Sequence, residues 1–418
     1  MILTLGTPIL PTARNSYRRS SPSNPVRLRI GVDVACWGNA RGYGRFTREL
    51  LRAMVELAPD DQFVCFLDHE SKPGFDLESQ NVRLATVRLS SPPALAAAAG
   101  RSRSIRDMLR LTRAVAGERL DVFFFPSVYT YFPLPPGLPA LTTIHDTIPE
   151  RYPELTLPRR RDRLFWRLKR TAALRQSRLV LTVSDYSARG IADVLAVAPE
   201  SIRVASEASP SIYRPSRPDD VVAAARRLGL KDGARWFVYV GGFNPHKRVD
   251  ALVQAHGRIV RDSPADPPHL LLVGDANRDV FHKDLDAIQR VVHAAGAESL
   301  VVWTGYVPDE ELRHLLSGAV ALVLPSRAEG FGLPAVEAAA CGTAIVATTE
   351  SPLPTLLAGG GCFVDPGDDA ALLEAMRFLL DHEPERRRMG LVAHERATRL
   401  SWQDAARVSM SALREIAK

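Results

Sequence analysis

Long apolar runs, paired cysteines and clusters of metal ligands are absent from this sequence, and each absence excludes a class of protein. Because no run of about 18 apolar residues occurs, no transmembrane helix is expected. Histidines and carboxylates show no metal-ligand spacing, so neither a metal nor another cofactor is expected. No Cys-x-x-Cys pair occurs, which favours buried free thiols in a reducing cytoplasm. The four cysteines are Cys36, Cys65, Cys341 and Cys362.

Residues 1–25 also lack the features of a signal peptide. The stretch from Met1 to Pro11 is apolar, but it has no basic flank and is interrupted by Gly6 and Pro8. The segment is rich in Ser, Pro and Arg, a composition typical of a disordered tail. An overextended start site is an alternative explanation of the same residues.

Positive charge is in excess, with a net charge of +7, and its distribution is uneven. Residues 159–178 hold nine Arg or Lys and one acid, Asp162. Such a segment attracts anionic lipid, nucleic acid or phosphorylated substrates. A solvated helix face would have the same composition. Because apolar bulk lies inside the charge run, we expect an anionic membrane surface as a partner, and no nucleic acid. The apolar residues are Leu164, Phe165, Trp166 and Leu168.

Short apolar runs alternate with helical patterns along the chain. The first series of candidate strands comprises residues 28–34, 63–67, 82–87, 122–125, 141–144 and 179–183. The second comprises residues 236–240, 270–273, 300–303, 319–324, 344–347 and 362–364. Helical patterns include residues 43–57, 249–260, 309–316 and 370–380. Many of the strands lack polar alternation, as strands of a parallel sheet covered on both faces do. The alternation therefore predicts a doubly wound α/β protein.

The two series of strands predict two domains. Residues 209–220 separate them and contain Pro210, Pro215 and Pro218, which is typical of a linker. We therefore expect an N-terminal domain over 26–208 and a C-terminal domain from residue 221 onward. Ligands of open α/β sheets bind at the carboxyl ends of the strands, so the expected site is the cleft between the domains.

A glycine-rich turn follows the apolar strand that ends at residue 324. Gly330 and Gly332 permit a tight turn and a close backbone approach to a ligand. Pro334 suits the first turn of a helix, where a missing N–H costs nothing. Free N–H groups and the dipole at such a helix start favour a phosphate group.

Two acids flank this turn, Glu329 before it and Glu337 in the helix that follows. Carboxylates repel phosphate, so they are better suited to accept hydrogen bonds from neutral sugar hydroxyls. The alternative is a loop acid and a surface acid, but the alanines that follow Glu337 indicate a buried helix.

The run Pro-Ser-x-x-Glu-Gly-Phe-Gly-Leu-Pro-x-x-Glu, residues 325–337, resembles the signature of retaining glycosyltransferase family 4. The resemblance implies the GT-B fold, in which two Rossmann-like domains face a central cleft, and a nucleotide diphosphate sugar as donor. It also implies that Glu337 binds the ribose hydroxyls. Glu329 and the backbone of Gly330, Phe331 and Gly332 would hold the transferred sugar and the diphosphate.

A second motif carries cations at the end of the strand 236–240. Lys247 matches a family lysine that stabilises the leaving diphosphate, in keeping with what a cation at the carboxyl edge of a sheet can do. The sequence departs from the family on both sides of it. His246 stands where Arg is common, and Arg248 stands where Asn or Gly is common. Arg248 either supplies the second phosphate contact or is exposed.

The N-terminal half carries two weaker matches. Gly42 and Gly44 match the family loop that faces the donor phosphates across the cleft. Thr47 replaces the third glycine of a dinucleotide fingerprint, so NAD binding is not expected. The run His145-Asp146-x-Ile-Pro resembles an element of mannosyltransferase-like members. By that resemblance His145 contacts the donor sugar or diphosphate, and Asp146 orients the loop.

Two further matches complete the resemblance. The backbone of Tyr306 and Val307 corresponds to the loop that meets the nucleobase. The terminal helix 401–418 corresponds to a helix that crosses back to the N-terminal domain, and residues 221–400 then form the donor domain.

The sequence thus predicts a glycosyltransferase that moves a hexose with retention of configuration. Mannose from GDP-mannose is favoured, with UDP-sugars next, and the acceptor is a glycan or a lipid-linked molecule of cell-surface polysaccharide synthesis. The expected location is the cytoplasm, with peripheral attachment to the inner face of the cell membrane. The alternatives are a nucleotide-sugar 2-epimerase of the same fold and a non-catalytic protein that kept the fold.

Overall fold

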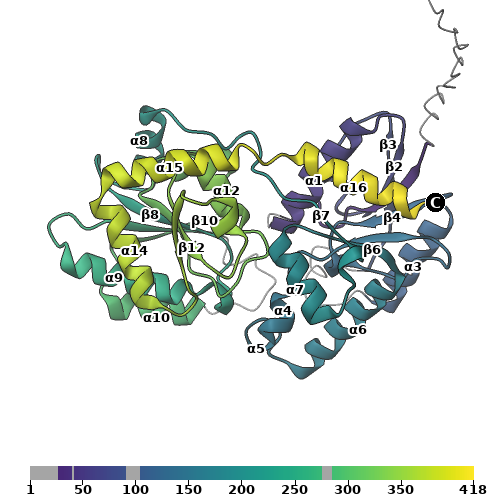
Figure 1. Cartoon of the computed structure of the whole chain (residues 1–418), viewed down its shortest axis with the longest axis horizontal. Coiled ribbons are helices and arrows are strands. Elements are labelled where there is room, and N and C mark those ends of the chain that lie inside the picture. The colour runs from purple at the N-terminus through teal and green to yellow at the C-terminus, as the bar shows by residue number, and fades with distance from the viewer. Residues whose placement is uncertain (1–26, 40–41, 91–103, 275–284) are drawn as a thin grey trace, which may run out of the picture.

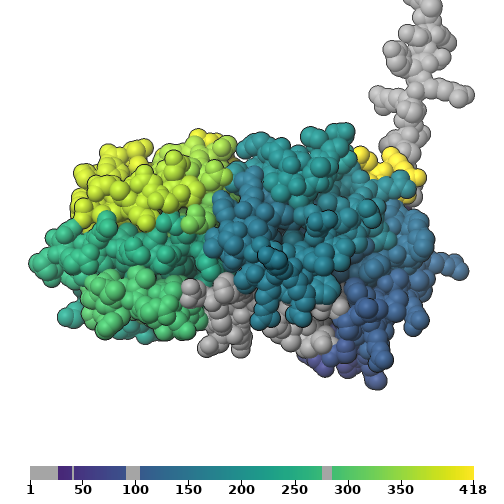
Figure 2. All heavy atoms as spheres, turned by 90° about the horizontal axis from the view of Figure 1, so that it is seen from below, coloured from purple at the N-terminus to yellow at the C-terminus, as the bar shows by residue number. Residues whose placement is uncertain are grey.

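The structure of the chain is a computed structural model that describes residues 27–39, 42–90, 104–274 and 285–418. It contains two α/β domains, each built on a fully parallel sheet (Figure 1), and the domains lie side by side along the longest axis of the molecule (Figure 2). The predicted disordered tail, residues 1–25, lies outside the described residues.

The sheet of the N-terminal domain has seven strands in the order β3-β2-β1-β4-β5-β6-β7. Their bounds are β1 Arg29–Asp33, β2 Gln62–Asp68, β3 Val82–Val87, β4 Val122–Phe125, β5 Ala140–Thr143, β6 Ser177–Thr182 and β7 Ile202–Val204. The sequence patterns predicted the first six. They missed β7, which has three residues with Arg203 in the middle, too short to show an apolar run.

The sheet of the C-terminal domain has six strands in the order β10-β9-β8-β11-β12-β13. Their bounds are β8 Trp236–Val240, β9 His269–Val273, β10 Val301–Gly305, β11 Ala321–Leu324, β12 Ile345–Thr348 and β13 Gly361–Val364. All six match predicted strands within two residues at each end. Because every strand pair is parallel, the loops that follow the strands gather at one edge of each sheet.

Helices cover both faces of the N-terminal sheet. They are α1 Gly42–Leu57, α3 Ile105–Ala116, α4 Ile148–Arg151, α5 Pro153–Thr156, α6 Arg160–Gln176 and α7 Asp185–Leu195, with short 3-10 turns at Lys72–Gly74, Val128–Thr130 and Pro199–Ser201. Buried side chains of α3, α6 and α7 share one apolar cluster on one face. Helix α1 belongs to a second cluster on the opposite face.

The C-terminal domain is covered in the same way. Its helices are α8 Pro218–Arg227, α9 Val249–Asp262, α10 Leu285–Ala295, α11 Asp309–Ser317, α12 Leu333–Ala340, α13 Leu353–Leu356, α14 Asp369–Asp381 and α15 Glu383–Ala397, with a 3-10 turn at Pro245–Lys247. Helix α8 begins at Pro218, inside the predicted linker 209–220, because proline fits the first position of a helix. The linker is therefore shorter than predicted.

The last helix, α16 (Trp402–Ile416), leaves the C-terminal domain and packs on the N-terminal one beside α1 (Figure 1). Trp402 stands against Phe46 of α1 with ring centroids 6.0 Å apart. This crossing ties the two domains together a second time. Among the helices that the structure describes, none is long and apolar enough to cross a membrane. All four cysteines are free thiols, and three of them are buried.

Candidate active site

The lysine and the first glutamate named from the sequence meet in the C-terminal domain. Lys247 Nζ lies 2.8 Å from Glu329 Oε1 and 2.9 Å from Oε2. The hydroxyl of Ser326 donates to the same Oε1 at 2.6 Å. Glu329 is 8% exposed, and these two partners satisfy the hydrogen-bonding needs of its buried carboxylate. The loops after β8 and β11, which are neighbours in the sheet, bring this pair together.

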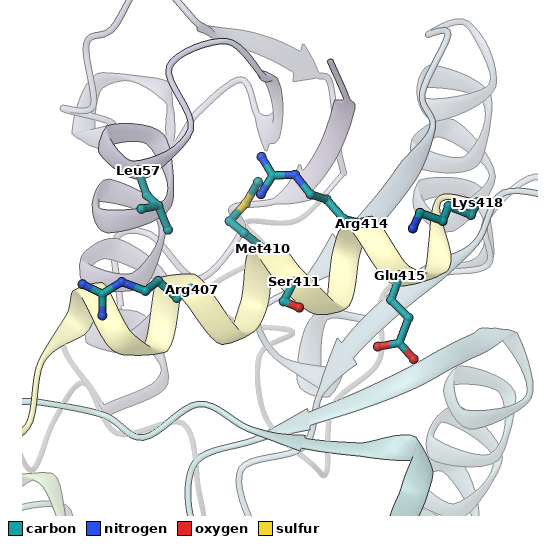
Figure 3. A pocket seen from close by; sticks show the side chains of 7 residues that line it. All are labelled: Leu57, Arg407, Met410, Ser411, Arg414, Glu415 and Lys418. Carbon is teal, nitrogen blue, oxygen red and sulfur yellow. The ribbon is translucent and has the colours of Figure 1, made fainter. Parts of the chain in front are cut away.

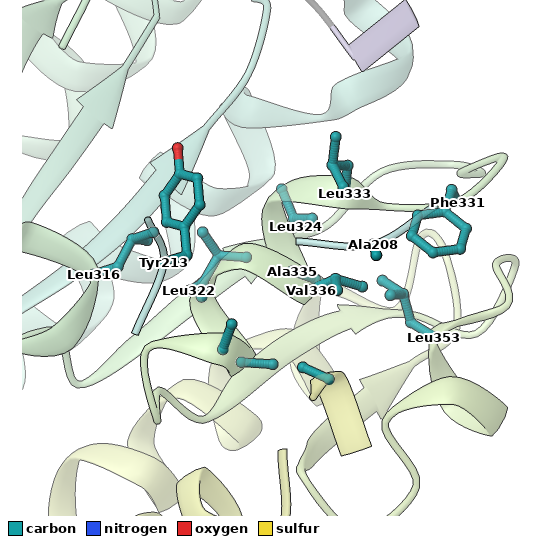
Figure 4. Close-up of a cluster of buried hydrophobic side chains, with 14 of the residues drawn as sticks. Ala208, Tyr213, Leu316, Leu322, Leu324, Phe331, Leu333, Ala335, Val336 and Leu353 are labelled. Atoms are coloured by element: carbon teal, nitrogen blue, oxygen red, sulfur yellow. The ribbon is translucent and has the colours of Figure 1, made fainter. Parts of the chain in front are cut away.

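The turn between β11 and α12 needs its glycines for different reasons. Gly332 adopts a φ of +85°, which disfavours any side chain, and stands where α12 begins. Apolar side chains of the turn and of its neighbours belong to the core of the C-terminal domain and anchor the turn there (Figure 4). They include Phe331, Leu333, Ala335, Val336 and Leu353. The helix therefore presents its N-terminal end, the favoured place for a phosphate, from a rigid base.

Gly330 has no room for a side chain because the N-terminal domain lies directly against it. A Cβ atom at this position would stand 2.7 Å from the backbone oxygen of His145 and 2.9 Å from Asp146 Cβ. The hydroxyls of Ser184 and Ser187, at the start of α7, donate to the Gly330 carbonyl at 2.6 and 3.0 Å. The predicted glycine turn thus touches the predicted His-Asp loop directly across the cleft.

His145 is held at this boundary by groups of its own domain. Its Nε2 lies 3.1 Å from the carbonyl oxygen of Pro126, and its Nδ1 lies 3.6 Å from Glu207 Oε1. The ring packs edge-on against Phe46, with centroids 4.8 Å apart. Asp146 accepts the N–H of Ile148 at 2.9 Å, as expected of a residue that orients the loop. Burial raises the pKa of Asp146, while the nearby hydrogen bond and cations act in the other direction.

Glu337 is the fifth residue of α12 and is buried. Its Oε1 stands 2.9 Å from Nη1 of Arg45, which belongs to α1 of the other domain. Burial raises the pKa of Glu337 to about 8, although the charge of Arg45 acts to lower it. Arg45 also donates to Asp309 Oδ1 at 2.7 Å and to the hydroxyl of Tyr213 at 3.3 Å. The second glutamate therefore also stands at the domain boundary.

Arg248 is neither exposed nor unpaired. Its backbone takes a left-handed φ of 53° at the start of α9, and its Nη2 lies 2.5 Å from Asp369 Oδ1 of α14. The loop after β10 follows Gly305, with φ +69°, and presents Tyr306, which is 61% exposed, next to Val307, which is 9% exposed. A base could stack on the former while the latter supports the loop.

The two glycines at the start of α1 differ. A Cβ atom on Gly44 would stand 2.1 Å from the backbone oxygen of Asn39, so this glycine lets the helix pack on the preceding loop. Gly42 is exposed, and a Cβ atom there would meet nothing within 4 Å. The glycine at position 44 is thus required by local packing, and open space surrounds the glycine at position 42.

A surface hollow of about 600 Å³ lies elsewhere, between the end of α1 and the outer side of α16 (Figure 3). Three of its four charged side chains have partners: Arg407 pairs with Asp404, Arg414 with Asp61, and Glu415 with Arg203. None of the site residues named from the sequence lines it. Within the described ranges, no group of three or more His, Cys, Asp or Glu is arranged to hold a metal ion.

Several residues of the site were not singled out from the sequence. Arg45 follows the Gly42-Tyr43-Gly44 turn, so the sequence could predict that it lies near the domain boundary. The sequence could not predict its partners on α11 and α12. Glu207 and the α7 serines follow strands β7 and β6, and that position at the carboxyl edge was the available signal. Their roles depend on contacts between distant segments.

Comparison with known families agrees with this geometry. The family described as "Glycosyltransferase Family 4" matches residues 40–207, and the family described as "Glycosyl transferases group 1" matches residues 223–396. The two matches lie on the two domains and together span more than half of the chain. The chain belongs to glycosyltransferase family 4. Its two parallel-sheet domains have the GT-B fold of this glycosyltransferase family.

Individual relatives are similar over part of their length. O-antigen chain mannosyltransferase B of Escherichia coli is 30% identical over 248 residues, 58% of this chain and 61% of that protein. D-inositol 3-phosphate glycosyltransferase of Frankia alni is 33% identical over 195 residues, 46% of this chain and 48% of that protein. The matched region thus spans about half to three fifths of these relatives.

Likeness in fold extends further than likeness in sequence. Sucrose-phosphate synthase from Thermosynechococcus elongatus has a TM-score of 0.72 at 20% identity, and the match covers 93% of this chain and 99% of that one. Both domains and their arrangement are therefore those of a known family fold.

Proposed function

We propose that this family 4 protein is a retaining hexosyltransferase that uses a nucleotide diphosphate sugar. The observation that carries the proposal is the pairing of Lys247 with Glu329 beside the Gly330 turn, against the loop of His145. A cation, a carboxylate, a helix N-terminus and a histidine then converge where two parallel sheets face each other. This set suits a sugar diphosphate, because the cation meets phosphate and the carboxylate accepts sugar hydroxyls.

In the proposed reaction the bond from the sugar C1 to the diphosphate oxygen breaks, and its electron pair leaves with the diphosphate. An acceptor hydroxyl oxygen forms the new bond to C1 on the same face of the sugar and passes its proton to the departing diphosphate oxygen. Charge grows on the diphosphate as the bond breaks, so Lys247 and the start of α12 stabilise the transition state more than the bound donor. Donor binding must first separate Lys247 from Glu329, which frees the carboxylate for sugar hydroxyls.

Because these cationic groups can stabilise the departing diphosphate, we propose that transfer needs no metal ion. Arg248 supports this proposal only in part, since Asp369 holds its guanidinium at 2.5 Å. Turnover that persists after treatment with a chelator would support the proposal. Loss of turnover that is restored by Mg²⁺ or Mn²⁺ would contradict it.

Mannose from GDP-mannose is the proposed donor sugar, with UDP-sugars next. The name of the Escherichia coli relative, an O-antigen chain mannosyltransferase, supports mannose and an acceptor of polysaccharide synthesis. His145, in the run that resembles mannosyltransferase-like members, lies against the Gly330 turn. The proposed acceptor is a glycan or a lipid-linked molecule, and the proposed location is the cytoplasm.

A membrane-docking face on the N-terminal domain fits a lipid-linked acceptor. On α6, Leu164, Phe165 and Leu168 are 56%, 49% and 57% exposed and lie among exposed arginines. On the neighbouring α3, which covers the same face of the sheet, Ile105 and Leu109 are 73% and 49% exposed. Arginines beside exposed apolar side chains suit an anionic bilayer.

One residue predicted for this face does not belong to it. Trp166 is buried and donates its indole N–H to Glu150 at 2.6 Å, so it packs in the core and cannot insert. Helix α6 nonetheless begins close to the cleft, because α5, just before it, contacts the turn that carries Lys247. A lipid-linked acceptor held on this face would therefore be near the reacting sugar.

Incubation with a panel of nucleotide sugars tests the proposed function. Slow release of free nucleoside diphosphate from one donor supports a transferase, and the donor released fastest identifies the sugar and the base. Interconversion of two nucleotide sugars without release would instead support the epimerase alternative. A chain that neither binds nor consumes any donor would contradict both.

A further inference from the structure

Arg45 is the side chain that connects the two sides of the site most directly. It extends from α1 of the N-terminal domain, yet its charged partners lie outside that domain. They are Glu337 on α12 and Asp309 on α11. Arg45 also donates to the hydroxyl of Tyr213, in the segment that joins β7 to α8. The guanidinium also stands over the Tyr213 ring, 5.4 Å from its centroid. Its side chain is 13% exposed and that of Glu337 is 5% exposed, so water screens this contact little.

Glu337 stands in a surplus of acids. Arg45 is the cation that faces it, from α1. The acids around it are Asp309 of α11, Glu207 after β7 and Glu49 of α1, and the phenol of Tyr213 is also near. A buried carboxylate among other acids favours the protonated state. A protonated Glu337 would accept hydrogen bonds from two adjacent hydroxyls less well than a carboxylate, which has two acceptor oxygens.

We propose that Arg45 is a positioning residue of the donor site: it reaches across the domain boundary to favour the carboxylate form of Glu337 and to place it for the nucleotide ribose. The proposal rests on the proposed function, since it assumes that Glu337 binds the ribose.

Asp309 accepts hydrogen bonds from the guanidinium of Arg45 at 2.7 Å and from the Tyr213 hydroxyl at 2.8 Å. Arg45 therefore reaches Glu337 only while α1 lies against α11 and α12. If these helices separated, Glu337 would lose its counter-charge, so ribose binding would favour the arrangement seen in the structure.

Binding of GDP and of UDP to the full chain, measured by calorimetry, tests the proposal. With Arg45→Gln, affinity at neutral pH should fall about tenfold or more, which corresponds to roughly 1.4 kcal/mol. Arg45→Lys should recover part of the loss, because it restores the charge without the fork of donors. The matched control is Arg83→Gln on β3 of the same domain, whose partner Glu118 is not among the groups around Glu337. It should bind as the wild type does.

The pH profile separates this role from mere packing. Affinity should rise with pH as Glu337 ionises, and the loss of a neighbouring cation raises the pKa of a carboxyl. In Arg45→Gln the rise should therefore move to higher pH than in the wild type, and affinity should recover in alkaline solution. Ionisation of the nucleotide is common to both proteins and cancels in the comparison.

Glu337→Gln completes a double-mutant cycle. In that background Arg45→Gln should change affinity less than about twofold, because there is no charge left to stabilise. If Glu337→Gln itself leaves nucleotide binding unchanged, the ribose role of Glu337 fails, and the proposal fails with it. If Glu337→Gln weakens binding while Arg45→Gln leaves affinity and pH profile unchanged, or tightens binding, only the role of Arg45 is overturned. Tighter binding would mean that Arg45 competes with the ribose.

Discussion

The two sides of the cleft differ in how far apart in sequence their residues stand. On the C-terminal side, Glu329, the glycine turn and Glu337 lie within one strand-turn-helix unit, and Lys247 follows the neighbouring strand. On the N-terminal side, Arg45, His145, Ser184 and Glu207 follow four different strands. The C-terminal residues form a local unit, which in the proposed function positions the sugar donor. The N-terminal residues come together only after the whole N-terminal sheet has formed.

This difference separates the proposed chemistry, on the C-terminal side, from the contacts that join the two domains, on the N-terminal side. In the proposed function, the C-terminal side binds the nucleotide sugar with groups that are fixed locally. The N-terminal side contributes single contacts that require closure, such as Arg45 to Glu337 and Ser184 to Gly330. Substitutions on the C-terminal side should therefore remove chemistry or binding, whereas substitutions on the N-terminal side should act on closure or on the acceptor.

The strongest test of the C-terminal side is Lys247→Ala. We expect turnover of the preferred donor to fall by about a hundredfold, while donor affinity changes less, because the cation acts mainly on charge that develops in the transition state. Steady-state kinetics measure both quantities. Lys231→Ala removes an exposed lysine of the same domain and should have no effect. A rise in the Michaelis constant with unchanged turnover would mean that Lys247 only binds the donor.

Glu337→Ala should act on binding instead. Loss of hydrogen bonds to a charged acceptor costs roughly 1–3 kcal/mol, so the dissociation constant of the preferred donor should rise accordingly. Calorimetric titration measures the change, and Glu374→Ala, which removes an exposed acid on α14, serves as the control. An unchanged dissociation constant would remove Glu337 from the donor site.

Gly330→Ala tests the contact between the two sides. The added methyl would meet the His145 backbone at 2.7 Å, and a backbone of the other domain can give way only if the cleft opens. Overpacking of this kind costs about 1–3 kcal/mol, so turnover should fall about tenfold while the isolated domains remain folded. Gly74→Ala is the matched control, because a Cβ atom there would meet nothing within 4 Å. Unchanged turnover would show that the closed contact is not needed for the reaction.

The same difference explains what the sequence could predict. Twelve of the thirteen strands followed from apolar runs, because a buried parallel strand is recognisable from its own residues. Glu329, Glu337 and Lys247 were singled out because they stand in strand-turn-helix segments that resemble motifs of the family. Arg45 and Glu207 were not, since an arginine on a helix and an acid in a loop acquire a role only from residues more than 60 positions away.

Local context also misled one interpretation. Trp166 stands among exposed apolar neighbours in the sequence. In α6 it nevertheless faces the core, where Glu150 accepts a hydrogen bond from its indole N–H. Leu164, Phe165 and Leu168 lie on the other side of the same helix. A helix with weak segregation of apolar residues does not reveal from its sequence which of them face inward.

The smallest effect on donor chemistry is expected from the outer face of α6, where the N-terminal side meets the proposed membrane. The wild type should bind anionic liposomes at low salt and lose most of that binding at high salt, since each basic residue near the surface contributes about 1 kcal/mol and the attraction is screened. Exposed arginines reversed to Glu should abolish binding and leave donor hydrolysis intact. The four are Arg160, Arg161, Arg167 and Arg175.

Arg163 is left out of this set because its Nε–H donates to the Leu157 carbonyl at 2.7 Å, and its loss would disturb the start of the helix. The matched control reverses the same number of exposed arginines on the C-terminal domain: Arg226, Arg387, Arg388 and Arg399. It has the same net charge, so retained binding would locate the effect on α6 rather than in total charge. Changing Leu164, Phe165 and Leu168 to Ser should weaken binding even at low salt, because the apolar contribution is not screened. A wild type that ignores anionic liposomes at low salt would mean that this face is only solvated, and a soluble acceptor would then fit the N-terminal side better.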